Sequence, residues 1–382
     1  MQITEELFQY VVDIRRRIHR HPEIGFDLPV TCALVREELD KIGFPYSDQY
    51  APCSFVVFIG NDPAKKTLGV RADMDALPIE EKTDLPFRSE VPGCMHACGH
   101  DTHTAILLGV AKLLKEHEAE LPCNVRLFFQ PSEECDKSGA EEMVKNGAMD
   151  GVDAVIGTHC DALDTDEIGL CTGDHMAACM PFNIYFHGRS SHAAAAPEKG
   201  IDALRMGFEA VERLEKAVKE AFKDKKYIWN VGVFKGGTAH NIIADFCEIH
   251  ITFRFFDEET ANAFRETAFG ILDEIAERFG GTVEKDAVTS AHSVYNDPVL
   301  AARFTEVLSK DPRVRLREMF PRMSSEDFAW YLTKAPGLLF RYGIRNEAEG
   351  CVYPAHSGNF KVDEQGFRSA LIAFTDFIMS FK

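Results

Sequence analysis

The segment NVRLFFQPSEE (124–134) joins the pattern of a buried strand to a pair of adjacent carboxylates. Its dense apolar run is typical of a strand covered on both faces, and a proline ends the run. Similar runs occur at KTLGVRADMD (66–75), AVIGTH (154–159) and GLLFRYGI (337–344). Helical spacing of apolar residues lies between or beside them, over 3–20 and 103–120. This alternation predicts an α/β fold, with a mostly parallel sheet and helices on both of its faces.

The pattern changes near residue 176. Beyond it the sequence predicts four strands and two long helices, in the order 182–188, helix 200–222, 229–237, 247–257, helix 258–280 and 281–288. This β-α-β-β-α-β order is that of a small ferredoxin-like α+β unit. We therefore predict a catalytic domain in two segments, 1–175 and 291–382, interrupted by an inserted satellite domain over 176–290.

Bulk composition limits the class of protein. With 42 basic and 61 acidic residues the net charge is −19, which argues against nucleic acid or an anionic membrane as partner. No apolar stretch is long enough to span a membrane, and the N-terminus lacks the pattern of a signal peptide. Eleven scattered cysteines, an odd number, favour reduced thiols and a cytoplasmic location.

Five side chains that can bind a metal lie near predicted strand ends: Cys98, His100, Glu134, His159 and His356. Functional groups of open α/β sheets gather at the carboxyl ends of strands, so we expect the five to converge on one site. Thiolate, imidazole and carboxylate together suit zinc or a related transition ion. The sequence thus predicts a metallohydrolase.

Each of these residues also has a simpler interpretation. Cys98 could be a buried apolar side chain, or a nucleophile paired with a histidine. An isolated Glu133-Glu134 pair would be a solvated acidic turn, His159 a core histidine and His356 a surface residue. Their shared strand-end context favours the metal site. Adjacent residues at a strand end point in different directions, so Glu134 can bind metal while Glu133 takes a proton from water.

Nine short motifs resemble one known family, in order along nearly the whole chain. They are HRHPE (19–23), RADMDALPI (71–79), HACGHD (96–101), QPSEE (130–134), GTH (157–159), SSHAAAAP (190–197), GGTAHN (236–241), MSSEDFAWYL (323–332) and AHS (355–357). They resemble the amidohydrolase branch of the dinuclear-metal aminoacylase and carboxypeptidase family. Its members include N-acyl-amino-acid, hippurate and indole-acetyl-amino-acid amidohydrolases, built as a catalytic domain interrupted by a dimerisation lid.

The resemblance implies two divalent ions per subunit, drawn from Zn, Mn, Co or Ni. By position, Cys98 would bridge the two ions. His100 and His159 would complete the protein ligands of one ion, and Glu134 and His356 those of the other.

The same resemblance implies roles for residues that do not bind metal. Glu133 would be the general base, and Asp75 would support the site from behind the ligands. His192, in the inserted domain, matches a histidine that stabilises the oxyanion in the partner subunit's site. Asn241 and Arg254 match substrate-binding positions, and Arg254 could hold a carboxylate through two hydrogen bonds.

We therefore expect a homodimeric amidohydrolase that converts an N-acyl-amino acid, or a related small amide, to a carboxylate and an amine. A dipeptidase or an aminobenzoyl-glutamate hydrolase is the alternative within the class, and a non-catalytic binding protein on the same scaffold lies outside it. Two departures bear on the substrate. The alanine run 193–196 is one residue longer than in many relatives, and His240 stands where they often carry an apolar residue.

Overall fold

The chain divides into two units in a computed structural model that describes residues 1–382. One unit comprises 1–175, 294–320 and 327–382, and the other comprises 176–293 and 321–326. The first boundary falls at the position predicted from sequence, whereas the second falls after residue 293 instead of residue 290. The short segment 321–326 was not anticipated in the inserted unit. It belongs there because the amide of Ala177 donates to the carbonyls of Arg322 and Ser324.

The first unit is built on an eight-stranded sheet. In order across the sheet, its strands are β1 (Tyr46–Ser47), β2 (Phe55–Ile59), β4 (Asn124–Gln130), β3 (Thr67–Asp73), β5 (Ala154–Asp164), β15 (Gly337–Arg345), β6 (Glu167–Leu170) and β14 (Arg315–Glu318). The pairs β4–β3, β3–β5, β5–β15 and β6–β14 are parallel. The pairs β1–β2, β2–β4 and β15–β6 are antiparallel. The predicted mostly parallel sheet is confirmed.

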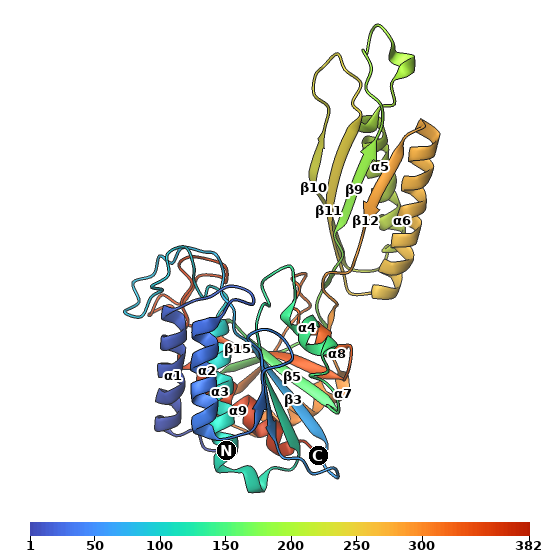
Figure 1. Cartoon of the computed structure of the whole chain (residues 1–382). Helices are drawn as coiled ribbons and strands as arrows, with labels where there is room; N and C mark the ends of the chain where they lie inside the picture. Colours follow the sequence, from blue (N-terminus) through green and yellow to red (C-terminus); the bar gives the residue numbers. More distant parts are fainter. The chain divides into compact units, whose positions relative to one another are not determined.

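Helices cover both faces of this sheet. Four lie together on one face: α1 (Glu5–Arg20), α2 (Pro29–Ile42), α3 (His100–Glu116) and α9 (Gly366–Ser380) (Figure 1). A fifth, α7 (Pro298–Leu308), packs on α9 through the rings of Phe304 and Phe377. On the other face lie α4 (Gly139–Lys145) and α8 (Ala329–Leu332), where Tyr331 stacks on Phe128 of β4. None of these helices is long and apolar enough to cross a membrane.

The inserted unit has the predicted order of elements: β9 (Phe182–His187), α5 (Ala203–Ala221), β10 (Tyr227–Gly236), β11 (Phe246–Phe255), α6 (Glu258–Phe279) and β12 (Thr282–Asp286). The strands form an antiparallel sheet in the order β10-β11-β9-β12, and β8 (Ala178–Cys179) also pairs with β11. Both helices cover one face of this sheet (Figure 1). Alternate strand residues such as Phe182, Ile184 and Phe186 are buried against them.

The remaining short elements connect these parts. They are β7 (Gly173–Met176), which pairs with β13 (Val294–Asn296), and the 3-10 turns 118–120 and 197–199. In the first unit, the strands β3, β4, β5 and β15 run parallel, so their carboxyl ends all lie on the same side of the sheet. The side chains on that side define the candidate site.

Candidate metal centre

Cys98 and His100 lie on either side of a glycine that begins α3. Gly99 is the N-cap residue, with φ 88° in the left-handed region. A Cβ atom there would come within 2.5 Å of the Cys160 sulfur, so both its conformation and its surroundings require glycine. The helix begins three residues earlier than predicted, at His100 itself. The tight turn brings the Cys98 and His100 side chains to the same side of the chain.

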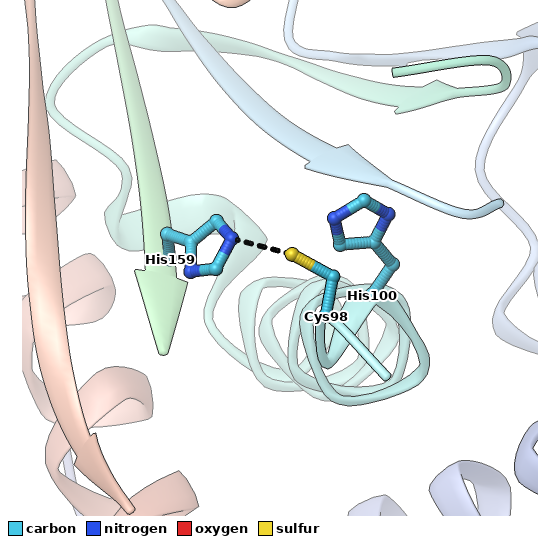
Figure 2. Close-up of side chains that lie close together, drawn as sticks. All are labelled: Cys98, His100 and His159. Carbon is cyan, nitrogen blue, oxygen red and sulfur yellow. Dashed lines mark hydrogen bonds between the residues drawn. The ribbon is translucent and has the colours of Figure 1, made fainter. Parts of the chain in front are cut away.

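His159 faces Cys98 from strand β5. The Cys98 sulfur lies 3.3 Å from Nε2 of His159, and His100 lies beside them (Figure 2). Nδ1 of His159 donates to the carbonyl of Cys160 at 2.7 Å, which leaves the lone pair of its neutral ring on Nε2. The sequence placed His159 at a strand end, but β5 continues to Asp164 because β15 pairs with it beyond this point.

Glu133 and Glu134 lie on one turn, which Asp75 holds at its tip. The two oxygens of Asp75 accept the backbone amides of Glu133 and Glu134, at 2.9 Å and 3.1 Å. Both carboxylates approach the ring of His100, so the divergence predicted for these adjacent residues is only partial. Oε2 of Glu133 lies 3.8 Å and Oε1 of Glu134 lies 3.9 Å from Nε2 of His100, and Oε1 of Glu134 also lies 3.0 Å from Nε2 of His356.

His356 reaches the site from the loop that follows β15. Its backbone is in the left-handed region, with φ 64°, and its amide donates to the carbonyl of Ala97 at 2.8 Å. A non-glycine residue in this conformation costs about 1–3 kcal/mol, so surrounding contacts must impose it. The bond to Ala97 fixes this loop beside the turn that carries Cys98.

These side chains form two adjoining groups of ligand atoms. One consists of Cys98, His100 and His159, and the other of Cys98, Glu134 and His356; within each, the atoms lie within 4.8 Å of one another. Cys98 belongs to both groups. The five residues predicted from sequence are therefore brought together, and their sulfur, nitrogen and oxygen donors fit a transition ion.

The surroundings of His100 also fit a metal. The ring is fully buried, and neither of its nitrogens has a hydrogen-bond partner. A buried polar atom without a partner costs about 1–3 kcal/mol, a penalty that coordination of a cation would remove. The nearest carboxylate is Oδ1 of Asp75, 3.5 Å from Nδ1.

Burial and neighbouring charges shift the pKa values of the site. Burial raises the pKa of the Cys98 thiol and lowers that of His159, which Arg341 lowers further. Burial opposes the charged form of His100, but the carboxylate of Asp73 and the Cys98 thiol raise its pKa above the usual value. The hydrogen bond to Glu134 raises the pKa of His356.

A buried network behind the ligands escaped the sequence analysis. Nδ1 of His103 donates to Asp73 at 2.6 Å, and its Nε2 accepts the backbone amide of Cys160 at 3.0 Å. The other oxygen of Asp73 accepts from Arg71 at 2.5 Å. The two charged residues in the apolar strand β3, Arg71 and Asp73, could have indicated this network, because charges are buried in a strand only where they have partners of opposite charge or hydrogen bonds.

The three remaining predicted residues all lie in the inserted unit. Nδ1 of His192 accepts the amides of Ala194 and Ala195, both at 3.2 Å. The carbonyl of Asn241 accepts the amide of Ala193 at 2.9 Å. Nη1 of Arg254 donates to the carbonyl of Met323 at 3.1 Å and to Oγ of Ser325 at 2.9 Å. Arg254 thus fastens the segment 321–326 to the inserted sheet, a role that the sequence did not indicate.

Comparison with known proteins gives consistent matches. The model of peptidase family M20/M25/M40 matches residues 69–380. Thermostable carboxypeptidase 1 of Saccharolobus solfataricus is 35% identical over 97% of this chain and 95% of its own. N-acyl-L-amino acid amidohydrolase of Geobacillus stearothermophilus is 38% identical over 74% of this chain and 77% of its own. The crystal structure of Bacillus subtilis YXEP, titled a dinuclear metal-binding peptidase, superimposes with a TM-score of 0.85 at 28% identity, over 99% of both chains.

We expect the affinity of this centre for zinc or cobalt(II) to rise with pH. The pKa values of Cys98 and His100 are both raised, so an incoming cation competes with protons for these two side chains. Competition from protons weakens as pH increases. Titration of metal-free protein from mildly acidic to mildly alkaline pH, in buffers of different ionisation enthalpy, measures both the affinity and the protons released. An affinity independent of pH, without proton release, would contradict this assignment.

Proposed function

The chain belongs to peptidase family M20/M25/M40, and we propose that it hydrolyses the amide bond of an N-acyl-amino acid to a carboxylate and a free amine. The main observation in support of this proposal is that Cys98 belongs to two groups of ligand atoms at once, with the Glu133 carboxylate beside them. This arrangement supports a site for two ions per subunit, of Zn, Mn, Co or Ni. His100 and His159 would hold one ion, Glu134 and His356 the other, and Cys98 would bridge them.

Glu133 is the general base of the proposed reaction. Divalent ions bound here supply Lewis acidity, which lowers the pKa of water and polarises a carbonyl group. Glu133 takes a proton from the attacking water and returns it to the leaving amine nitrogen. Asp75 holds the backbone amide of Glu133 and so fixes where its carboxylate can reach. Glu134 would instead hold an ion together with Cys98 and His356.

His192 is the proposed donor to the oxyanion. Because its Nδ1 accepts two amides of the alanine run, the neutral ring carries its proton on Nε2. That N–H is the group required to donate to a developing negative oxygen. Asn241 and the remaining N–H groups of Arg254 are the proposed contacts to the substrate, where Arg254 suits a carboxylate.

We also propose a cytoplasmic homodimer formed through the inserted domain. Strand β10 is an edge of its sheet and can pair with another copy. Beside that edge, Phe208 of α5 is 62% exposed and stacks on Phe234 of β10 with ring centroids 5.0 Å apart. The cytoplasmic location is proposed from the odd number of cysteines, because scattered thiols are typical of a reducing compartment.

A peptide substrate is the second candidate, favoured by the carboxypeptidase name of the Saccharolobus relative. A panel of N-acyl-amino acids, dipeptides and aminobenzoyl-glutamate, assayed with several added divalent ions, separates these substrates. Turnover should vanish after exhaustive chelation and return with added metal. A thiol hydrolase acting through Cys98 would instead stay active in chelator, and a binding protein would turn over nothing in the panel.

Replacement of the two adjacent glutamates should give different phenotypes. Glu133→Gln removes the base but not a ligand, so we expect turnover to fall about 10²–10⁴-fold with metal content retained. Glu134→Gln should lower metal occupancy, as measured by elemental analysis. Asp136→Asn is the matched control, because Asp136 is an exposed carboxylate on the same turn. Exchange of the two phenotypes would reverse the assignment.

If His192 serves the partner subunit's site, two inactive variants should complement each other. A heterodimer of Glu133→Gln and His192→Ala chains contains one site with both an intact base and an intact histidine, so activity should return. A heterodimer of Glu133→Gln and Glu134→Gln chains is the control if both carboxylates act within one subunit's site. Verified heterodimers of the first pair with no more activity than the control would rule out the exchange.

A further inference from the structure

Asp327 is a buried carboxylate with no role in the chemistry described so far. It is 6% exposed and begins the segment by which the chain re-enters the first unit. Its Oδ1 accepts from Nη2 of Arg71 at 2.7 Å and from Nε2 of Gln130 at 2.9 Å. Its Oδ2 accepts from Oγ of Ser138 at 2.7 Å and from the amide of Ala140 at 3.2 Å. A carboxylate that accepts from so many groups stays ionised inside the protein.

The partners of Asp327 flank the turn that carries the two glutamates. Gln130 is the last residue of β4, before the turn, and Ser138 caps the first turn of α4, after it. Within the turn, Oγ of Ser132 donates to the carbonyl of Lys137 at 2.7 Å, and the amide of Gly139 donates to the carbonyl of Ser132 at 2.9 Å. Both ends of the turn are therefore tied to one carboxylate, while Asp75 holds its tip.

The same network reaches the opposite side of the site through Arg71. This guanidinium bonds Asp327 through Nη2, Asp73 through Nη1 and Gln130 through Nε. Asp73 in turn orients His103, which accepts the amide of Cys160, the residue after His159. One arginine thus links the supports of the glutamate turn to those of the strand that carries His159.

We propose that Asp327 is a positioning residue, which fixes the turn that carries Glu133 and Glu134 and so sets their placement relative to Cys98 and His100. The proposal rests on the proposed function for the effect on turnover, but not for the effect on metal binding. If Asp327 only stabilised the fold, its replacement would lower the stability of the protein without changing the arrangement of the metal ligands.

Two variants test the proposal. Asp327→Asn disturbs the acceptor for both ends of the turn, and we expect kcat to fall about 100-fold with little change in KM, as a displaced catalytic group does. Affinity for cobalt(II) should fall about 10–100-fold, and the absorption spectrum of the bound cobalt should change because Glu134 moves. Ser138→Ala removes the bond to Asp327 and the cap on the Glu141 amide without changing the charge, and should give smaller effects in the same direction. The double variant should be no worse than Asp327→Asn, because both changes act on one network.

Asp297→Asn is the matched control. Asp297 caps α7 by accepting the amides of Val299 and Leu300, and its own amide donates to Gly337 at the opposite end of β15 from the site. This variant should lower the melting temperature but leave kcat and the cobalt spectrum unchanged.

The outcomes separate the two proposals. If folded Asp327→Asn and Ser138→Ala proteins keep the wild-type kcat and cobalt spectrum, or if Asp297→Asn alters both equally, Asp327 is not a positioning residue. If Glu133→Gln keeps full turnover, the proposed base is wrong, yet the cobalt spectrum still reports whether Asp327 positions Glu134.

Discussion

The interior of the first unit contains nitrogen and sulfur atoms that can bind a metal, and some of them lack a hydrogen-bond partner. His100 is the clearest case, because its ring is fully buried and neither nitrogen is hydrogen-bonded. The fold accepts a penalty of about 1–3 kcal/mol for each such atom. Across the same space the Cys98 sulfur lies 3.3 Å from Nε2 of His159. The fold thus loses some stability by burying these atoms, and a bound cation would supply the missing interactions. The surrounding hydrogen-bond network holds the side chains in place.

The two adjacent glutamates have overlapping but unequal surroundings on their turn. Glu133 and Glu134 share one turn and one carboxylate that holds their amides, and both lie within 4 Å of the His100 ring, while Glu134 also pairs with His356 at 3.0 Å. Although burial works to raise its pKa, His356 and His100 hold the pKa of Glu134 below the usual value. The turn therefore places both carboxylates beside His100 and one of them also beside His356.

The sequence predicted the parts of the molecule that depend on local patterns. The sheet strands and the order of the inserted elements follow from apolar runs. The convergence of Cys98, His100 and His356 was predicted from strand-end positions, but Cys98 lies in the loop before α3, His100 begins α3, and His356 lies in the loop after β15. The sequence did not predict the pairing of Arg71 with Asp327, because 256 residues separate them and nothing local marks the contact. It also missed that Arg254 binds the segment around Ser325, for the same reason. Buried charges in a strand signal that a partner exists, but only the tertiary structure identifies the partner.

The place of β15 in the sheet has a consequence for how the chain is made. It lies between β5 and β6, but the ribosome produces it only after the whole inserted domain. The inserted domain's six main elements are contiguous, so that domain can fold while the main sheet still lacks an inner strand. In that interval β5 and β6 expose unpaired edges, which favour pairing with other chains. Until β15 is made, the main sheet therefore presents two unpaired strand edges, although most of the inserted domain has already been synthesised.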